Sequence, residues 1–594
     1  MVGGRSYHSK SLVMKGEKIV AGIGVGRNYF IDKNFSDIPH NYIENRPEKH
    51  EEQKKRFVDA VKKAKTEIMD TIKEEHLPKE AVSILKTHKA MLTDKVMHEK
   101  IFGEIEKNNI NVEWAVLNVF KQLEDMLLGS GGNYYSLAKT ADMKTIQDKI
   151  LSYLINHKNK DVKKLPIPDD DFIICSQNLS ITEINPFVKS GNLKGVALEA
   201  SGGVSHLTVV LRAYGIPAVL GIKNLISELD YNDCLIVDGV SGNVILRPGK
   251  KERTKYIKRK KRYDSYYSKF LENVEEPAVS RDGSSIDVEG NIEMLDETNF
   301  ILKYGADAVG LFRTEFMFLD SQKPPSEEEH YKLYYEILHR LEPKKVTVRI
   351  FDFGGDKEGN IINTKGSMGR RGIRLFRTAP HIFRPQIRGM LKASELGNLN
   401  ILLPFVSSTE EVLYFKKILH EEAENLNCTK NLKKIELGAM IELPAAFFIA
   451  EELAETVDFF SVGTNDLIQY LMAVERNDKS LSRYFSHFHP AVIRILYKLS
   501  RIASRSDTKI SICGEIGGDP YFSLLFLGMG IDSLSMSPVS IPVVKKIIKS
   551  GYYQEGRDLL DKVLKSGTEH KLKKTLKNDM KEKYPNIFKS IWTE

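Results

Sequence analysis

The C-terminal half of the chain contains eight candidate strands separated by helical stretches. Beyond about residue 276 these segments recur at intervals of 22 to 54 residues. Eight strands that alternate with helices over roughly 300 residues are typical of a (β/α)8 barrel. We therefore predict a C-terminal barrel over residues 276–594. The segments begin at residues 286, 308, 346, 400, 435, 459, 509 and 533.

Polar and charged side chains follow five of these predicted strands. A (β/α)8 barrel carries its active site at the C-terminal ends of its strands, so we expect these side chains to share one rim. Any one of them could equally form a structural ion pair. Apolar strands that repeatedly end in charged groups nevertheless favour a functional site. The residues are Arg313, Arg349, Lys357, Glu442, Asn465, Asp466 and Cys513.

The residue types at this rim indicate the kind of ligand. Guanidinium groups bind phosphate and carboxylate oxygens. Glu442 and Asp466 offer the carboxylate oxygens that Mg2+ prefers together with substrate oxygens. We therefore expect a small, multiply anionic, metal-chelating ligand. A kinase-like Asp-Phe-Gly at 352–354 stands alone, without the other kinase signatures. The guanidinium groups belong to Arg313, Arg349, Arg371 and Arg476.

The N-terminal part predicts an α/β domain that is interrupted by helices. Short apolar strands precede and follow a charge-dense block whose apolar residues recur at helical spacing. We assign residues 1–45 and 160–249 to the α/β domain, and residues 46–159 to an inserted bundle of about four helices. The charges of the bundle fit either a solvated face or a docking surface for a protein.

His206 follows a Gly-Gly turn and begins a predicted helix that runs to about Tyr214, with Gly215 as the residue just beyond its end. The N-terminus of a helix stabilises a nearby anion. A neutral imidazole can act as a nucleophile. These features suit a histidine that becomes phosphorylated, although a capping or surface histidine fits the segment equally well.

The net charge of +8 is concentrated in one stretch, since nine of the thirteen residues from Lys250 to Arg262 are Lys or Arg. We interpret residues 250–275 as a solvated helical linker and expect no nucleic-acid partner. No apolar run is long enough to cross a membrane. The four cysteines form no CxxC pair, and no secretory signal is evident, so we expect a cytoplasmic protein.

Several long strings resemble Enzyme I of the sugar phosphotransferase system, the family of phosphoenolpyruvate-protein phosphotransferases. The resemblance spans essentially the whole chain. It implies a phosphohistidine (swivelling) α/β domain, an inserted helical subdomain that docks the phosphocarrier HPr, a linker helix, and a TIM barrel that binds phosphoenolpyruvate and forms a homodimer. The strings are GADAVGLFRTEFMFLD, FDFGGDK, MIELPAA, DFFSVGTNDLIQY, CGEIGGD and LGMGIDSLSMSPVSIP.

The same resemblance implies a role for each site residue. His206 matches the histidine that takes the phosphoryl group of phosphoenolpyruvate and passes it to HPr. Cys513 matches the acid that protonates the enolate carbon to give pyruvate. Glu442 and Asp466 match the Mg2+ ligands, and Ser180 matches a threonine that supports the phosphohistidine. The residues at substrate-binding positions are Arg313, Arg349, Lys357, Arg371, Asn465, Asp466 and Arg476.

The loop around His206 departs from the family pattern. Val204 stands where the family has a threonine, and Leu207 stands where it has a small residue. A second hypothesis is therefore a phosphoenolpyruvate-sensing regulatory or nitrogen-type relative with weakened relay activity. Ligand binding without phosphorylation would separate it from an active phosphotransferase.

Overall fold

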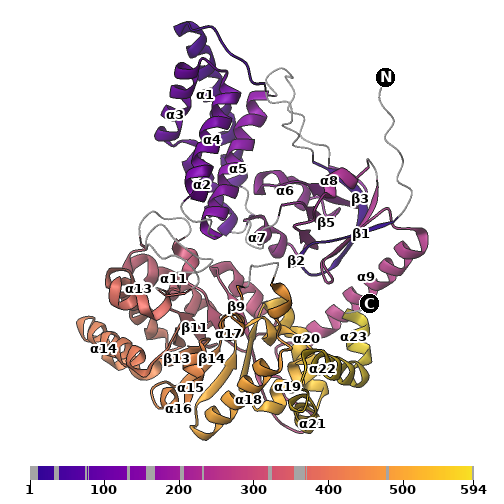
Figure 1. Ribbon diagram of the computed structural model, residues 1–594, viewed down its shortest axis with the longest axis vertical. Coiled ribbons are helices and arrows are strands. Elements are labelled where there is room, and N and C mark those ends of the chain that lie inside the picture. The colour runs from indigo at the N-terminus through magenta and orange to yellow at the C-terminus, as the bar shows by residue number, and fades with distance from the viewer. Residues whose placement is uncertain are drawn as a thin grey trace. The chain divides into compact units, whose positions relative to one another are not determined.

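The computed structural model describes residues 11–31, 39–73, 77, 79–129, 134–155, 167–200, 206–230, 233–318, 324–352, 368–369, 371–475 and 481–591. The chain divides into two compact units. The first comprises Met1–Ser265 with Ser590–Glu594, and the second comprises Tyr266–Lys589. The division falls inside a single helix, α9 (Lys250–Leu271), which is the predicted linker (Figure 1).

One mixed sheet forms the α/β part of the first unit. Its strand order is β1-β8-β7-β3-β4-β5-β6-β2. β3 precedes the helical block in sequence and β4 follows it, yet the two pair in parallel, with Arg27 opposite Phe172 and Phe30 opposite Cys175. The predicted insertion is therefore confirmed. The strands are β1 (Leu12–Lys15), β2 (Glu17–Val20), β3 (Ile23–Phe30), β4 (Phe172–Ser176), β5 (Leu193–Leu198), β6 (Ala218–Leu220), β7 (Cys234–Asp238) and β8 (Asn243–Leu246).

The inserted bundle has five helices among its described residues, whereas the sequence predicted about four. The difference lies at Asp94, whose side chain accepts hydrogen bonds from the backbone N–H of Val96 and Met97. This cap starts a new helix where the apolar periodicity alone continued. The helices are α1 (Pro47–Ile72), α2 (Lys79–Leu92), α3 (Lys95–Asn108), α4 (Val112–Gly129) and α5 (Tyr134–Ile155).

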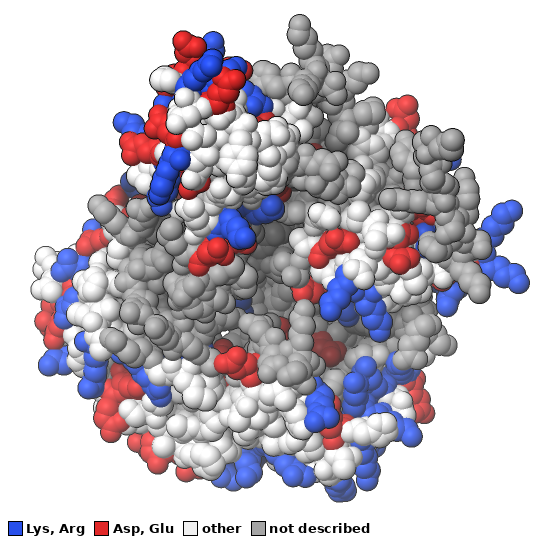
Figure 2. All heavy atoms as spheres, turned by 45° about the horizontal axis from the view of Figure 1, so that its top comes forward, with Lys and Arg blue, Asp and Glu red and all other residues white. Residues whose placement is uncertain are grey.

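Acidic and basic side chains are intermixed on the surface of the bundle, at the upper left of Figure 2. Lys54 on α1 pairs with Glu51 one turn earlier and with Glu106 on α3, at 2.7 and 2.6 Å. Ion pairs of this exposed kind contribute little stability. These charged side chains lie at the surface of the bundle, which fits either of the two interpretations.

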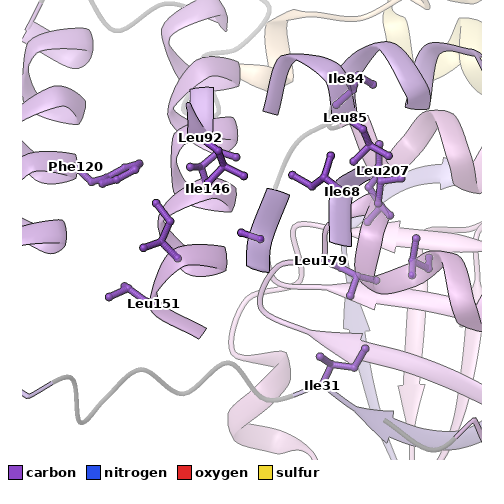
Figure 3. Packing of buried hydrophobic residues seen from close by; sticks show 14 of the residues in the cluster. Ile31, Ile68, Ile84, Leu85, Leu92, Phe120, Ile146, Leu151, Leu179 and Leu207 are labelled. Carbon is purple, nitrogen blue, oxygen red and sulfur yellow. The ribbon is translucent and has the colours of Figure 1, made fainter. Parts of the chain in front are cut away.

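The bundle and the sheet share one apolar core. Ile68 on α1 and Leu85 on α2 gather with Leu207 and Leu179 of the α/β part (Figure 3). Leu207 belongs to α7 (His206–Ala213), which begins at the predicted nucleophile. The helix ends as predicted, because Gly215 adopts a left-handed φ of 63°. The other helices here are α6 (Ile181–Val188) and α8 (Leu225–Glu228).

The second unit contains a closed barrel of eight strands, and all eight predicted strands are confirmed. Neighbouring strands pair in parallel around the whole ring. The strands are β9 (Asp287–Ile292), β10 (Val309–Phe312), β11 (Val346–Arg349), β12 (Leu399–Leu403), β13 (Glu436–Ile441), β14 (Phe459–Val462), β15 (Lys509–Ile512) and β16 (Ser533–Met536).

Amphipathic helices follow the barrel strands. In α11, Ser326 accepts a hydrogen bond from the N–H of Glu329, and Tyr334, Ile337 and Leu341 bury one face. The helices of this unit are α10 (Thr298–Lys303), α11 (Glu327–Leu341), α12 (Leu375–Thr378), α13 (Pro380–Ala393), α14 (Thr409–Asn425), α15 (Pro444–Phe448), α16 (Ala450–Ala454), α17 (Thr464–Met472), α18 (Pro490–Arg505), α19 (Ser523–Met529), α20 (Ile541–Ser550), α21 (Tyr553–Leu564), α22 (Glu569–Lys583) and α23 (Pro585–Ile591). Within the described ranges, no helix combines the length and apolarity that crossing a membrane requires.

The α9 linker is basic but not uniformly solvated. Arg259 is buried and donates to Asp238 at 2.5 Å, and its guanidinium lies 5.4 Å from the ring centroid of Tyr256. Tyr256 in turn packs against the apolar group of Ile23, Ile236 and Ile245. One face of the predicted solvated helix therefore anchors it to the sheet.

His330 on α11 is fully buried, and its Nδ1 lies 3.1 Å from the Tyr334 hydroxyl. Burial lowers the pKa of His330 to about 3. An unfolded histidine has a pKa of about 6.5, so between these values the unfolded chain binds more protons and stability falls as the pH falls.

Replacing this buried histidine should therefore flatten the acid side of the stability profile. As the pH falls from 6.5 to 5, the unfolding free energy of wild type should drop by about 1.6 kcal/mol relative to that of His330→Asn. Urea unfolding at both pH values measures the change, with the exposed His381→Asn as control. If the difference in unfolding free energy between wild type and variant were the same at both pH values, His330 would not be buried in its neutral form.

Candidate active site at the barrel rim

The Arg371 guanidinium is held by three side chains at the rim. Its Nε and Nη2 donate to the two carboxylate oxygens of Asp352 at 3.0 and 2.6 Å, which makes a bidentate pair. Its Nη1 donates to Asp466 at 3.3 Å and to the Tyr470 hydroxyl at 3.0 Å. Arg371 is buried, so these bonds fix the direction of its charge. Arg371 and Asp466, both predicted from sequence, are thus brought together.

Arg349 and Arg313 lie at the ends of adjacent strands. Arg349 ends β11, and its Nη2 donates to Glu315 at 2.7 Å. Arg313 follows β10, and its Nη1 donates to Glu293 at 2.7 Å. The Nε atoms of both arginines are buried, and neither has a hydrogen-bond partner in the described part of the chain. A buried donor without an acceptor is costly, so these N–H groups suit an anionic ligand that would complete them.

Glu442 follows β13 and is almost completely buried, with Oε1 accepting the backbone N–H of Phe405 at 2.6 Å. Burial, and after it the negative charges of Asp466 and Asp352, raise the pKa of Glu442. A cation between Glu442 and Asp466 would relieve this cost, and carboxylate oxygens are the ligands that Mg2+ prefers.

The local backbone leaves space beside this carboxylate. A Cβ at Gly463 would lie 2.9 Å from Oε2 of Glu442, so the glycine keeps that oxygen clear. The pair therefore fits a hard divalent cation that takes its remaining ligands from substrate and water. No cluster of three or more His, Cys, Asp or Glu suited to a metal occurs among the residues that the structure describes.

Cys513 follows β15 and is buried beside Leu311, Leu402 and Met440. Its Sγ donates to the carbonyl oxygen of Val462 at 3.4 Å. Burial raises the pKa of Cys513 to about 11, and the negative charge of Glu442 raises this pKa further. A hydrogen bond with Ser461 and the positive charges of Arg349 and Arg313 lower the pKa and offset part of the rise. The thiol is therefore neutral at physiological pH and carries a proton that it can give to a base.

Asn465 is the second residue of α17, and its Nδ2 donates to Glu515 at 3.4 Å. Its Oδ1 is buried and has no hydrogen-bond partner among the described residues. Lys357 and Arg476 lie outside the described residues. The rim thus brings together seven predicted residues, six just after strands or at their ends and Arg371 in the connection between β11 and β12: Arg313, Arg349, Arg371, Glu442, Asn465, Asp466 and Cys513.

His206 and Ser180 belong to the first unit. The backbone of His206 starts α7, as predicted, and its side chain lies outside what the structure describes. Ser180 directly precedes α6, and its hydroxyl donates to Glu183 at 2.7 Å. Its oxygen keeps lone pairs that can accept a further hydrogen bond. Leu207, which departs from the family pattern, is buried against the bundle.

Three residues that hold the rim were not predicted as site residues. Asp352 and Tyr470 bind Arg371, and Phe405 binds Glu442. Asp352 lies in the FDFGGDK string, so the strand-end rule already pointed to it. Tyr470 lies one and a half turns into a helix, and Phe405 sits in an apolar run, so neither gave a signal.

Comparisons with known proteins match three segments of the chain to families of PEP-utilising enzymes. Residues 269–552 match the "PEP-utilising enzyme, PEP-binding domain", residues 15–136 the "PEP-utilising enzyme, N-terminal" family and residues 168–242 the "PEP-utilising enzyme, mobile domain". These segments coincide with the barrel, with the region that contains the inserted bundle, and with the α/β sheet around His206.

Curated relatives match nearly end to end. A phosphoenolpyruvate-protein phosphotransferase of Bacillus subtilis (strain 168) is 30% identical over 93% of this chain and 97% of its own length. Those of Geobacillus stearothermophilus and Staphylococcus aureus (strain MSSA476) are each 31% identical. They cover 86% and 89% of this chain, and 89% and 92% of their own lengths.

Proposed function

The chain belongs to the family of phosphoenolpyruvate-protein phosphotransferases, and from this premise we propose that it phosphorylates itself on His206 and passes the phosphoryl group to a phosphocarrier protein of the HPr type. The observation that carries the proposal is the rim, where the buried Arg349 and Arg371, the half-buried Arg313, a carboxylate pair and a neutral thiol lie at one end of the barrel. A regulatory relative without transfer activity is not favoured.

Phosphoenolpyruvate carries a phosphate, a carboxylate and a reactive double bond, and the rim offers positive charge for the anionic groups and a neutral thiol for the double bond. Arg313 and Arg349 offer buried Nε donors to the phosphate. Arg371 adds positive charge that its carboxylate partners hold in place. Phosphoryl transfer depends mainly on such positioning and charge stabilisation. We assign Asn465 to the same ligand, together with Lys357 and Arg476 on the basis of their family positions.

Glu442 and Asp466 are the residues that would hold a divalent cation, which we assign as Mg2+. When bound, such a cation supplies charge that stabilises the transferring phosphoryl group and the departing oxygen. The protein contributes a buried carboxylate, Glu442, whose orientation is fixed by the backbone N–H of Phe405.

The proposed transfer uses His206 as the nucleophile and Cys513 as the acid. The imidazole nitrogen of His206 attacks the phosphorus, and the bond between phosphorus and the enol oxygen breaks, leaving its electron pair on that oxygen. The enolate carbon then takes the thiol proton of Cys513, which gives pyruvate, and solvent returns a proton to the thiolate. The transferred phosphate is held as a nitrogen–phosphorus bond at the N-terminus of α7.

The partner and assembly follow from the same family membership. We propose that the five-helix bundle docks the phosphocarrier, that the barrel forms a homodimer, and that the protein is cytoplasmic. The first test of the function is incubation with phosphoenolpyruvate and Mg2+, which should leave an acid-labile phosphate on the protein. A protein that binds phosphoenolpyruvate but never acquires phosphate would support the regulatory alternative instead.

Removing the charge of the buried carboxylate should weaken the response to metal. Glu442→Gln keeps an oxygen for the Phe405 N–H but loses the negative charge, so the Mg2+ concentration for half-maximal labelling should rise about 10- to 100-fold. Titration of labelling with Mg2+ measures this, and the exposed Glu410→Gln on α14 is the matched control. An unchanged half-maximal concentration would remove Glu442 from the metal site.

A further inference from the structure

Phe405 adopts a backbone conformation that is rare for a large side chain. It lies two residues after β12, its φ is 61°, and its side chain is buried. The left-handed region suits glycine and asparagine, and a bulky residue held there is strained. Such strain persists only where the surrounding contacts hold the residue, and it concentrates at functional sites.

Two of the three cationic or aromatic side chains that contact the Phe405 ring among the described residues, Arg371 and Tyr470, belong to the rim, and the third is Arg374. The guanidinium carbon of Arg371 lies 4.6 Å from the ring centroid, and that of Arg374 lies 4.7 Å from it. The ring of Tyr470 meets the Phe405 ring edge to face at 5.7 Å. Each guanidinium is therefore within the range of a cation–π interaction, and that of Arg371 is desolvated.

The strained backbone also serves the carboxylate side of the site. At this φ the N–H of Phe405 donates to Oε1 of Glu442 at 2.6 Å. Gly372 makes the approach possible, because a Cβ there would lie 2.5 Å from the Cβ of Phe405. The backbone at Gly372, next to Arg371, therefore packs directly against the side chain of Phe405 in the loop after β12.

We propose that Phe405 is a positioning residue: its ring orients the Arg371 guanidinium, and its backbone N–H orients the Glu442 carboxylate. One residue would then hold both the phosphate-binding and the cation-binding side chain in place. This inference rests on the proposed function, since the aligned groups are the phosphoenolpyruvate ligands assigned above. Ordinary core packing would be met by any apolar side chain of similar volume. Positioning instead requires a π face and an N–H at this φ.

The test separates the ring from its volume. Phe405→Leu and Phe405→Met keep an apolar side chain and the backbone N–H but lose the π face, whereas Phe405→Tyr keeps it. Phe526→Leu is the matched control, because Phe526 on α19 is equally buried, stacks on Phe522, and faces no guanidinium in the described contacts. All variants are made in the His206→Ala protein for calorimetric binding of phosphoenolpyruvate with Mg2+, and in the wild-type chain for KM and kcat.

We expect Phe405→Leu and Phe405→Met to weaken phosphoenolpyruvate binding about 10- to 30-fold, from the loss of a desolvated cation–π contact. The rise should appear in Kd and KM, with kcat changing less than about threefold because the retained N–H still orients Glu442. Phe405→Tyr should stay within about threefold of the parent. The midpoint temperature of thermal unfolding should fall by a similar amount in Phe405→Leu and Phe526→Leu.

An unchanged Kd in both Phe405→Leu and Phe405→Met would overturn the inference, as would an equal loss of binding in Phe526→Leu. Failure of the proposed function gives a different pattern. In that case the wild-type chain acquires no phosphate, while the calorimetric Kd still reports whether the Phe405 ring supports the anion site. Absence of any phosphoenolpyruvate binding to the parent protein would overturn both.

Discussion

Replacing His206 with alanine is expected to abolish phosphorylation of the protein by phosphoenolpyruvate. The imidazole is the proposed nucleophile, and removal of a covalent nucleophile costs about 10⁴-fold or more in rate. The alanine variant should therefore carry less than about one part in 10⁴ of the wild-type initial rate of labelling. Radiolabelled phosphoenolpyruvate with Mg2+, followed by alkaline gel electrophoresis, measures it.

The loss at His206 should be specific to transfer and leave binding intact. The residue starts α7 in the first unit, whereas the residues assigned to phosphoenolpyruvate lie in the second. Calorimetric affinity for phosphoenolpyruvate should therefore stay within about threefold of wild type. His381→Ala, at an exposed position on α13, is the control for loss of a histidine as such. Equal labelling of wild type and His206→Ala would show that another residue accepts the phosphate.

Replacing Cys513 with alanine is expected to slow pyruvate formation by about 10²- to 10⁴-fold, the usual contribution of a positioned general acid. The buried thiol holds its proton because burial raises its pKa to about 11. Cys513→Ser should be impaired nearly as much, because a hydroxyl is a far weaker acid. A coupled lactate dehydrogenase assay follows pyruvate directly.

Two measurements separate this acid role from a packing defect. Transfer from the phosphorylated protein to the carrier involves no carbon protonation, so it should proceed at the wild-type rate in Cys513→Ala. Cys428→Ala, at a partly buried cysteine of the same unit, should retain full pyruvate formation. In wild type, no loss of rate through thiol ionisation is expected near pH 8.5, where an exposed cysteine titrates. Unchanged pyruvate formation in Cys513→Ala would exclude it as the acid.

The barrel was predictable because its signal repeats. Several strands, such as Leu399–Leu403 and Glu436–Ile441, are short, mostly apolar runs of the kind that a strand covered on both faces requires, and eight candidate strands at suitable intervals fit few other folds. The strand-end rule then placed Arg349, Glu442 and Cys513 at one rim without further information. The insertion of the bundle followed from strands on either side of it.

The features that the sequence did not reveal depend on side-chain geometry. Asp94 looks like any exposed acid until its carboxylate is seen to cap α3 and divide one periodic stretch into two helices. In the sequence Phe405 is one more apolar residue after a strand, because neither its φ of 61° nor its contact with Arg371 has a sequence signature. Arg259 lies in a basic stretch that predicted solvent exposure, yet its side chain is buried and pairs with Asp238.

The stoichiometry of one complete phosphoryl transfer tests the proposed function most directly. Wild-type protein is incubated with excess labelled phosphoenolpyruvate and Mg2+, pyruvate and bound phosphate are counted together, and an HPr-type phosphocarrier is then added. We predict one pyruvate released for each phosphate bound, one phosphate per chain on His206, and near-complete transfer of that phosphate to the carrier. Pyruvate release without a protein-bound phosphate, or a bound phosphate that no phosphocarrier removes, would contradict the proposed function.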